Sequence, residues 1–429
     1  MPPHRPDEPN SDDHFDVVVV GGGAAGVAAA SGAASAGART LLLERTTALG
    51  GAATLRNVLG YCGLWTCEPV PRKAVGGVAD DLLSTLRSLD AVSEMTVVGE
   101  DHWAVVFLDP EGLKLAFDRL CREKGVEVRL GATLTGVARR DDQVRALRYN
   151  DYGGSTTTIT SEAVVDATGD ATVAALGGAA VAIGAAGRTQ TATMAVRYGG
   201  IDKAASVTPQ SFGAAVTRAQ QDGLADLTSS TGFVMRLPVS GDVVAYLADE
   251  DLDPLDASSY TAATQHGRVQ AWAYLQVLRT IPGCGSAYIV STGPELGIRQ
   301  SRHVVSRIPL SEKTLRDGTV DGDTVALAAW PSEYHGGSGQ PTEWVTIGGN
   351  HAFGVSIDNL RSADTTNLFA AGRVLTGDRI VGAAVRVMGT ALATGHAAGV
   401  AAALSLDPAS ELTARTRHEL DRQGAILHL

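Results

Sequence analysis

Three glycines near the start of the chain have the spacing of a dinucleotide-binding loop. They follow the apolar run at residues 15–20 in a G-x-G-x-x-G pattern: Gly21, Gly23 and Gly26. The first glycine permits a tight turn, the second lets the backbone approach a pyrophosphate, and the third lets the next helix pack closely. Ala24 and Ala25 would open that helix, whose N-terminal N–H groups and dipole favour phosphate.

A carboxylate follows the next apolar run, residues 40–43. Glu44 stands close to the usual separation of about 20 residues from the glycine loop, where a carboxylate accepts hydrogen bonds from ribose hydroxyls. With strand, helix and acid all in place, a dinucleotide site is favoured over a plain glycine-rich turn. The same carboxylate disfavours a 2'-phosphate, so NADP is not expected in this site.

Five residues are candidates for catalysis or substrate binding. His335, in a glycine-rich loop, suits a general base or substrate anchor, the alternative being a solvent-exposed loop histidine. Arg386 could hold a substrate carboxylate through its bidentate fork, or form a salt bridge to Asp378. Arg299 stands three residues before Arg302, and a structural ion-pair network explains this pair equally well. Tyr334 is a weaker candidate, as is His351, and both have ordinary loop explanations.

Composition limits the class of protein. The 429 residues suit a Rossmann-type domain with a second domain inserted into it. The net charge of -12 argues against a nucleic acid or an anionic membrane as partner, and favours a small molecule. No apolar run is long enough to cross a bilayer. Residues 1–13 lack the apolar core of a secretory signal, so we expect a disordered extension and a cytoplasmic location.

The pattern of apolar runs predicts an α/β fold. Helices are expected over residues 71–89, 113–124 and 258–278, and a charged surface helix over 411–423. Residues 134–165 predict a small antiparallel unit, and residues 189–359 predict strands with one helix. The expected domains are a discontinuous dinucleotide-binding domain, residues 14–188 and 360–429, and an inserted, mixed β-rich substrate domain, residues 189–359.

Five segments together resemble the FAD-dependent oxidoreductases of the glutathione-reductase-like superfamily: residues 16–30, 44–45, 50–54, 166–170 and 367–403. The resemblance is nearest to the branch of the succinate dehydrogenase and fumarate reductase flavoproteins. The middle of the chain matches only at residues 297–302 and 330–335. The resemblance implies a Rossmann-like FAD-binding domain and non-covalent FAD.

The family pattern also implies which residues contact FAD. A helix beginning near Val387 would point its N-terminus at the flavin pyrimidine and stabilise negative charge there. For Gly395 and Gly399 we expect close helix packing instead, and for Asp170 either a helix cap or a site role. The implied contacts are Gly21, Gly23, Ala24, Ala25, Gly26, Glu44, Arg45, Gly51, Ala52, Thr54, Ala167, Thr168, Gly169, Gly372, Arg373, Val387, Met388, Gly389 and Thr390.

Two cysteines, Cys62 and Cys67, have the C-x4-C spacing of disulfide reductases with this fold. In those enzymes the pair almost directly follows the glycine doublet, whereas Cys62 stands eleven residues beyond Gly51. We therefore expect ordinary thiols, and no zinc-type cysteine pair or other metal site is recognised.

The sequence favours an enzyme that dehydrogenates a small organic substrate by hydride transfer to the flavin and passes electrons to oxygen or another acceptor. The absence of a second dinucleotide fingerprint motivates this direction. The alternatives are a flavin-dependent double-bond reductase, an NAD(P)H-driven monooxygenase, or a binding protein with structural FAD. The sequence does not determine the electron acceptor, and a homodimer is the commonest arrangement if the chain oligomerises.

Overall fold

The computed structural model describes residues 13–184, 187–407 and 411–429. The predicted extension, residues 1–13, lies outside the described residues except for its last position.

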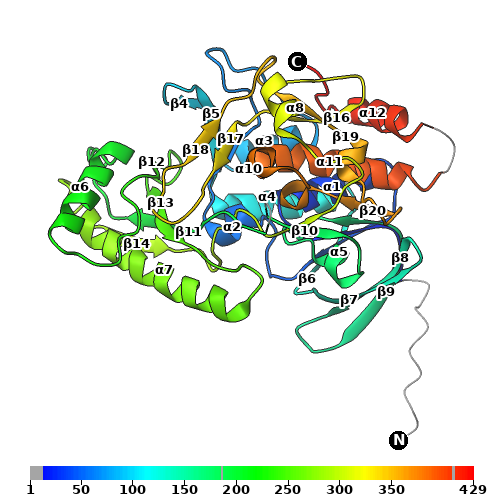
Figure 1. The fold of residues 1–429 in the computed structure, drawn as a ribbon, viewed down its shortest axis with the longest axis horizontal. Helices are drawn as coiled ribbons and strands as arrows, with labels where there is room; N and C mark the ends of the chain where they lie inside the picture. The colour runs from blue at the N-terminus through cyan, green and yellow to red at the C-terminus, as the bar shows by residue number, and fades with distance from the viewer. Residues whose placement is uncertain (1–12, 185–186, 408–410) are drawn as a thin grey trace, which may run out of the picture.

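A seven-stranded sheet forms the centre of the fold (Figure 1). Its order is β6–β2–β1–β9–β8–β7, and β20 also pairs with β9. Neighbours among the first four strands and β20 run parallel, whereas β8 is antiparallel to both β7 and β9. The strands are β1 (His14–Val20), β2 (Thr40–Glu44), β6 (Glu127–Leu130), β7 (Thr133–Arg140), β8 (Gln143–Asn150), β9 (Thr156–Asp166) and β20 (Leu368–Ala370).

The two ends of the chain meet at this sheet. Helix α1 (Ala24–Ser35) lies along α11 (Met388–Leu404), and both contact β1 (Figure 1). A Cβ on Gly395 or Gly399 would stand 2.1 or 1.9 Å from a carbonyl oxygen of α1. The helix-packing interpretation of these two glycines is therefore confirmed. Because β20 pairs in register with the last residues of β9, the C-terminal segment completes the sheet that the N-terminal segment begins.

Further elements surround α1, α11 and the sheet. Helices α3 and α4 pack on each other, and α12 packs on α11. Asp109 caps α4, whose first residue is a proline that needs no hydrogen-bond partner for its nitrogen. These elements are α2 (Ala52–Arg56), β3 (Gly60–Cys62), α3 (Val78–Ser88), β4 (Thr96–Val98), β5 (Trp103–Phe107), α4 (Pro110–Glu123), α5 (Thr172–Leu176) and α12 (Leu412–Arg422).

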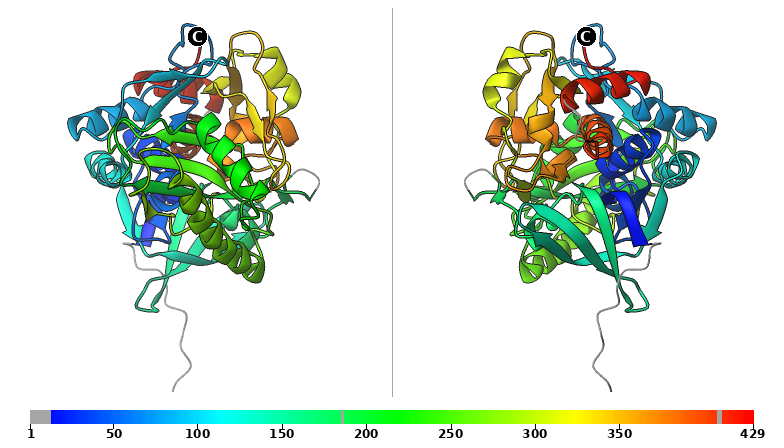
Figure 2. Two further views of the ribbon diagram at one scale, coloured as in Figure 1. Left: turned by 90° about the vertical axis from the view of Figure 1, so that its left-hand side faces the viewer. Right: turned by 90° about the vertical axis from the view of Figure 1, so that its right-hand side faces the viewer.

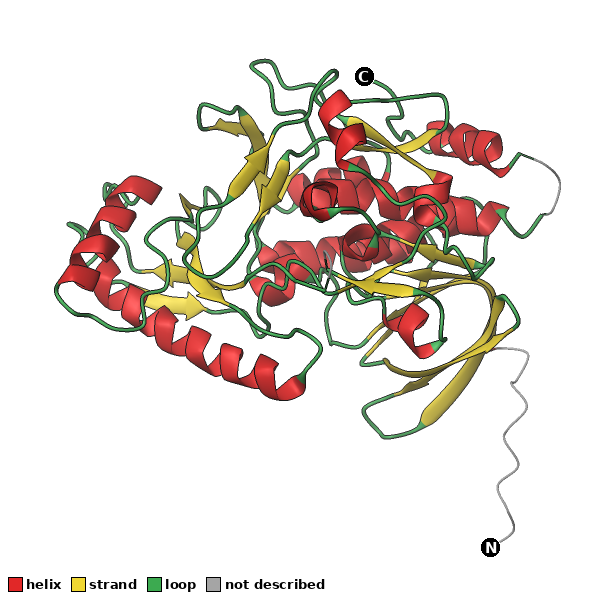
Figure 3. Cartoon of the chain, viewed as in Figure 1, coloured by secondary structure: helices red, strands yellow, loops and turns green. Residues whose placement is uncertain are grey.

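The middle of the chain forms a second sheet, with the order β12–β13–β11–β14. Together with two helices it encloses a hydrophobic cluster distinct from the main core, and it forms the left-hand part of Figure 3. Its elements are β11 (Ala192–Gly199), α6 (Pro209–Gln221), β12 (Phe233–Arg236), β13 (Val243–Glu250), α7 (Ala257–Leu278) and β14 (Tyr288–Ser291).

Short strands and helices link this sheet to the C-terminal segment (Figure 2). Three two-stranded pairs occur here, β10–β15, β16–β19 and β17–β18. The elements are β10 (Val181–Ile183), β15 (Arg302–Val304), α8 (Glu312–Asp317), β16 (Thr324–Ala328), β17 (Ser332–Tyr334), β18 (Glu343–Val345), β19 (Phe353–Ser356), α9 (Ile357–Leu360), η2 (Gly372–Val374) and α10 (Arg379–Val385).

The mixed α/β architecture with a parallel sheet is confirmed, but several details of the prediction are wrong. The helix expected from residue 71 begins only at Val78, because Gly77 before it has φ +62°. The middle region contains α6, α8 and most of α9 as well as α7, where one helix was expected. The antiparallel unit at residues 134–165 forms as predicted, but β9 merges it with the main sheet.

Within the three described ranges, no single helix is long and apolar enough to cross a membrane, and only the pair α10 and α11, bent by 87°, passes that test jointly.

Candidate cofactor and active site

The glycine loop has the backbone geometry that its spacing predicts. Gly21 has φ +101°, and a Cβ on Gly26 would stand 1.7 Å from the carbonyl oxygen of Gly21. Gly23 is the N-cap of α1, and no side chain of a described residue caps this helix. The first N–H groups of α1 are thus left for an anion.

Glu44 holds the glycine loop through hydrogen bonds. Its carboxylate accepts the Gly22 N–H at 2.6 Å and both the N–H and the hydroxyl of Thr46 at 2.8 Å. The residue is 7% exposed. Since Oε2 accepts one of these bonds and Oε1 two, Oε2 keeps a lone pair for a ribose hydroxyl.

A second glycine turn approaches the loop. Gly50 and Gly51 have φ +115° and +53°, and a Cβ on Gly51 would lie 2.9 Å from the Cα of Gly23. The Thr54 hydroxyl donates to the carbonyl of Leu49 at 2.9 Å, which closes the turn before α2. Ala52 and Thr54 therefore lie in a segment held against the N-terminal end of α1.

The exit of β9 forms the third side of this region. A Cβ on Gly21 would lie 2.5 Å from the carbonyl oxygen of Ala167. Thr168 donates from its N–H and its hydroxyl to Asp166 at 3.1 and 2.7 Å, and Gly169 follows with φ +81°. The turn predicted at residues 167–169 thus adjoins the glycine loop.

Asp170 does not cap the helix that follows, because the N-cap of α5 is Ala171 and it has no side-chain hydrogen bond. Its carboxylate instead pairs with Arg373 at 3.0 Å and accepts the Ser301 hydroxyl. Burial would raise the pKa of Asp170, but the charge of Arg373 and the Ser301 hydrogen bond lower it. Arg45 forms a salt bridge with Glu295.

The N-terminus of α11 lies beside the turn after β3. Val387 is its N-cap, with no side-chain cap among the described residues. A Cβ on Gly389 would lie 2.4 Å from the carbonyl carbon of Gly63, so only glycine permits this approach. The hydroxyl of Thr390 is buried without a hydrogen-bond partner in the described part of the chain. The first turn of α11 therefore holds polar groups that a ligand could satisfy.

Four charged or ionisable side chains meet near this helix end, and we call Arg299, Glu333, His335 and Arg386 the polar cluster. Arg386 donates to the Glu333 carbonyl at 2.7 Å and lies 3.7 Å from its carboxylate. His335 Nε2 lies 3.1 Å from Glu333 Oε1, and its Nδ1 lies 3.2 Å from the Thr342 hydroxyl. Arg299 donates to the carbonyl of Thr191 at 2.6 Å.

Burial and charge determine the ionisation of the polar cluster. Burial would raise the pKa of Glu333, but the hydrogen bond from His335 and the charge of Arg386 lower it to about 2. Burial and the charge of Arg299 lower the pKa of His335 to about 4, although Glu333 opposes this. Burial also lowers the pKa of Arg386, to about 10. At neutral pH the cluster thus holds two cations, one carboxylate and a neutral histidine.

The comparison with protein families matches residues 16–419 to a model described as FAD dependent oxidoreductase. The chain belongs to this family. It is therefore an FAD-dependent oxidoreductase, and an enzyme. The alternative of a binding protein with structural FAD does not agree with this membership. No curated protein sequence matches the chain.

Solved structures are similar to the chain at low sequence identity and with TM-scores below 0.5. A geranylgeranyl bacteriochlorophyll reductase-like protein from Thermoplasma acidophilum is 13% identical with a TM-score of 0.46, covering 96% of this chain and 84% of that chain. The p-nitrophenol 4-monooxygenase PnpA from Pseudomonas putida DLL-E4 is 13% identical with a TM-score of 0.49, covering 96% and 85%. The myxobacterial chondrochloren halogenase CndH is 15% identical with a TM-score of 0.43, covering 96% and 79%. These likenesses carry no inference about the reaction.

The residues of this FAD-dependent oxidoreductase fit its cofactor. The uncapped start of α1 would hold the pyrophosphate, and Glu44 has a free lone pair for the ribose. The uncapped start of α11, with the unpartnered hydroxyl of Thr390, would face the flavin. Gly372 is tied to α11 by its N–H, which donates to the Thr394 hydroxyl at 3.2 Å.

Several alternatives for the candidate residues can now be decided. Arg386 does not pair with Asp378, because Asp378 caps α10. The side chain of His335 is only 16% exposed, so it is not a solvent-exposed loop histidine. Tyr334 lines a cavity near the polar cluster, whereas His351 does not line it.

Sequence reasoning missed Glu333, the carboxylate on which the polar cluster depends. It directly precedes the candidates Tyr334 and His335 in a segment that carried the family resemblance, and this position was the available signal. Thr342, the hydrogen-bond partner of His335 Nδ1, is brought close by the pairing of β17 with β18. The sequence did not reveal this pairing, because both strands are short.

Cys62 and Cys67 are free thiols in this structure. Burial raises the pKa of Cys62 well above its usual value, and the charge of Glu333 raises it further. Burial raises the pKa of Cys67 to about 11. Both are therefore protonated at neutral pH and poor nucleophiles. Within residues 13–184, 187–407 and 411–429, no group of three or more histidine, cysteine or acidic side chains could hold a metal ion.

Proposed function

We propose that this enzyme dehydrogenates a small organic substrate by hydride transfer to flavin N5 and passes the electrons to oxygen or another acceptor. Bound FAD supplies the two-electron chemistry. The observation that carries the proposal is the buried polar cluster next to the N-terminus of α11, with two arginines and one carboxylate. We assign residues 189–359, which supply Arg299, Glu333 and His335, to a substrate domain.

The net positive charge of the polar cluster suits a reaction in which negative charge develops near the N-terminus of α11. Arg386 directly precedes the N-cap of α11, and its side chain is only 14% exposed. A fixed cation in a site with little water stabilises developing negative charge more than it would in bulk solvent. The N-terminal dipole of α11 acts in the same direction.

In this proposal, His335 accepts the proton from the substrate. Its Nε2–H donates to the Glu333 carboxylate, which assigns the lone pair to Nδ1, where the Thr342 hydroxyl lies at 3.2 Å. When this hydroxyl turns away, Nδ1 can accept a proton from a substrate hydroxyl or amine. Because the pKa of His335 is about 4, the ring releases that proton readily to solvent. Glu333 is a positioning residue that fixes the tautomer.

An anaerobic half-reaction tests the direction. The purified enzyme is mixed with candidate alcohols, amines and acids, and the flavin absorbance is followed. Bleaching by a substrate without NAD(P)H supports dehydrogenation, whereas turnover only with NAD(P)H as electron source overturns it. Light-reduced enzyme that reduces an enoate anaerobically would reverse the direction, in line with the succinate dehydrogenase and fumarate reductase branch. Oxygen insertion driven by NAD(P)H would establish a monooxygenase instead.

The non-covalent state of FAD, the cytoplasmic location and the lack of nucleic-acid and membrane partners stay predictions from sequence, as does a homodimer.

A further inference from the structure

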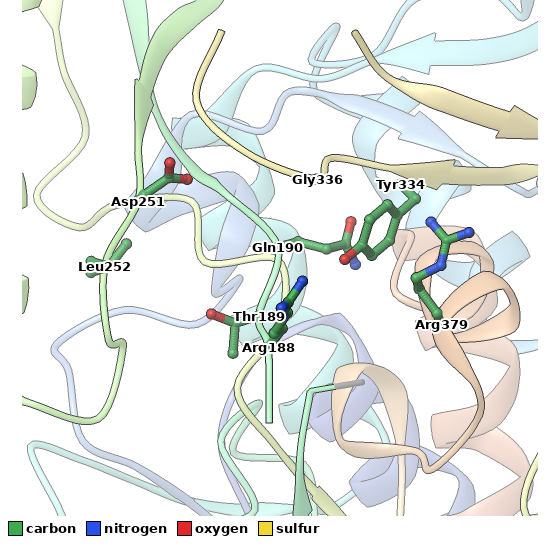
Figure 4. A pocket seen from close by; sticks show the side chains of 8 residues that line it. All are labelled: Arg188, Thr189, Gln190, Asp251, Leu252, Tyr334, Gly336 and Arg379. Carbon is green, nitrogen blue, oxygen red and sulfur yellow. The ribbon is translucent and has the colours of Figure 1, made fainter. Parts of the chain in front are cut away.

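A cavity of about 490 Å³ opens beside the polar cluster (Figure 4). Its wall includes Tyr334, the last residue of β17, and Arg379, the first residue of α10. In Figure 4, Arg188 and Gln190 lie between these two residues and Asp251. Cavities of this size accept small organic ligands.

Gln190 is the first sign of a ligand. The residue is 3% exposed and lines the cavity. Its Oε1 accepts the backbone N–H of His335 at 3.2 Å, but its Nε2 has no hydrogen-bond partner among the described residues. Leaving a buried amide donor unsatisfied destabilises the protein. An acceptor that reached this buried amide from the cavity would recover that cost, and the bond to His335 joins this position to the polar cluster.

The charges of the wall indicate which acceptor fits. Arg379 is neutralised by Glu343 through two hydrogen bonds and lies 4.5 Å from the centre of the Tyr334 ring. Arg188 is exposed, and its guanidinium makes no ion pair with any described residue. Asp251 lies on the far side of the cavity in Figure 4 and accepts the Ser338 N–H and the Thr191 hydroxyl. The cavity lining thus offers one available cation, Arg188, and one carboxylate, Asp251.

We propose that this cavity binds a small monocarboxylate, whose carboxylate is held by the Arg188 guanidinium and the Gln190 amide. The far end of the ligand faces Asp251, which repels a second carboxylate and attracts an ammonium group. Amino acids and neutral monocarboxylates therefore fit better than dicarboxylates. The inference rests on the proposed function, since it names the substrate class of the same site.

Calorimetric titration of the FAD-loaded protein with L-alanine, propionate and succinate tests the site without turnover. We expect L-alanine and propionate to bind more tightly than succinate. Arg188→Gln should weaken L-alanine and propionate binding at least about tenfold, as expected for a lost charged hydrogen bond. The matched control is Arg268→Gln, which removes the same charge from an exposed position on α7 that does not line the cavity and should leave binding unchanged.

Asp251→Asn supplies the opposite change. It should strengthen succinate binding and weaken L-alanine binding, because the repulsion and the attraction disappear together. No binding of any probe to the wild type, or equal binding to Arg188→Gln, would overturn the inference. If the probes bind through Arg188 while no small substrate bleaches the flavin, the proposed function fails and the binding site stands. If a substrate bleaches the flavin equally in Arg188→Gln, with unchanged affinity, only the binding site fails.

Discussion

The replacement Glu333→Gln removes the one carboxylate of the polar cluster while keeping its shape. Lowering the pKa of Glu333 from 4.5 to about 2 corresponds to about 3 kcal/mol of stability at neutral pH, at about 1.4 kcal/mol per pH unit. The side chain is 26% exposed, and solvent screening reduces this to about 2 kcal/mol. We expect Glu333→Gln to lose about this much, because Arg386 and Arg299 remain buried without their anion.

The pH dependence has a defined sign. A carboxyl group whose pKa is lower in the folded state contributes its full stability above its unfolded pKa and loses it as the pH falls towards the folded pKa. The difference between the wild type and Glu333→Gln should therefore be constant from pH 7 to about 5 and shrink below about pH 4.5. The lowered pKa of His335 adds a loss of wild-type stability as the pH falls below 6.5, because the unfolded chain then binds a proton that the folded chain does not.

Denaturant unfolding of the FAD-loaded protein at several pH values measures both effects. Glu312→Gln is the matched control, because Glu312 forms an exposed pair with Arg316 and should change stability by no more than about 0.5 kcal/mol. Equal midpoints for the wild type and both variants at pH 7 would refute the charge balance described for the polar cluster.

Three further outcomes are expected. Gly26→Ala should abolish most FAD binding, because its Cβ would stand 1.7 Å from the Gly21 carbonyl oxygen. The measurement is flavin absorbance per protein. The control Gly322→Ala, where a Cβ would meet open space, should bind FAD normally. Cys62→Ser should leave light-driven flavin reduction unchanged. Because the pKa of the Cys62 thiol is raised, it should react with iodoacetamide only after unfolding, and fast labelling of the wild type at neutral pH would contradict this. Asp170→Asn should lower stability by about 1–3 kcal/mol in the same denaturant assay, because Arg373 loses its partner, and an unchanged midpoint would show that the pair is not stabilising.

The glycine loop was predictable because its constraints are local. The positive φ of Gly21 and the contact of Gly26 with its carbonyl arise within six residues of chain. Glu44 follows from the same pattern, since β1 and β2 are neighbouring parallel strands. The start of α11 at Met388 also matched the expectation, because the family pattern covers that segment.

The polar cluster was only partly predictable because its members come from distant parts of the chain. Burial would raise the pKa of Glu333, and the hydrogen bond from the nearby His335 and the charges of Arg386 and Arg299 lower it. Nothing in the local sequence around residue 333 reports the two arginines. Gln190 meets His335 across 145 residues. Helix α6 was missed although its signals were local: Thr208 and Ser211 form a capping box with a proline at the first turn.

The most direct test of the account is the identity of the bound cofactor. The purified protein is denatured, and the released compound is identified by its absorbance and mass. We expect FAD, released without a covalent bond to the chain. A colourless protein that FAD cannot reconstitute would contradict the assignment of the glycine loop, Glu44 and the start of α11 to one flavin site.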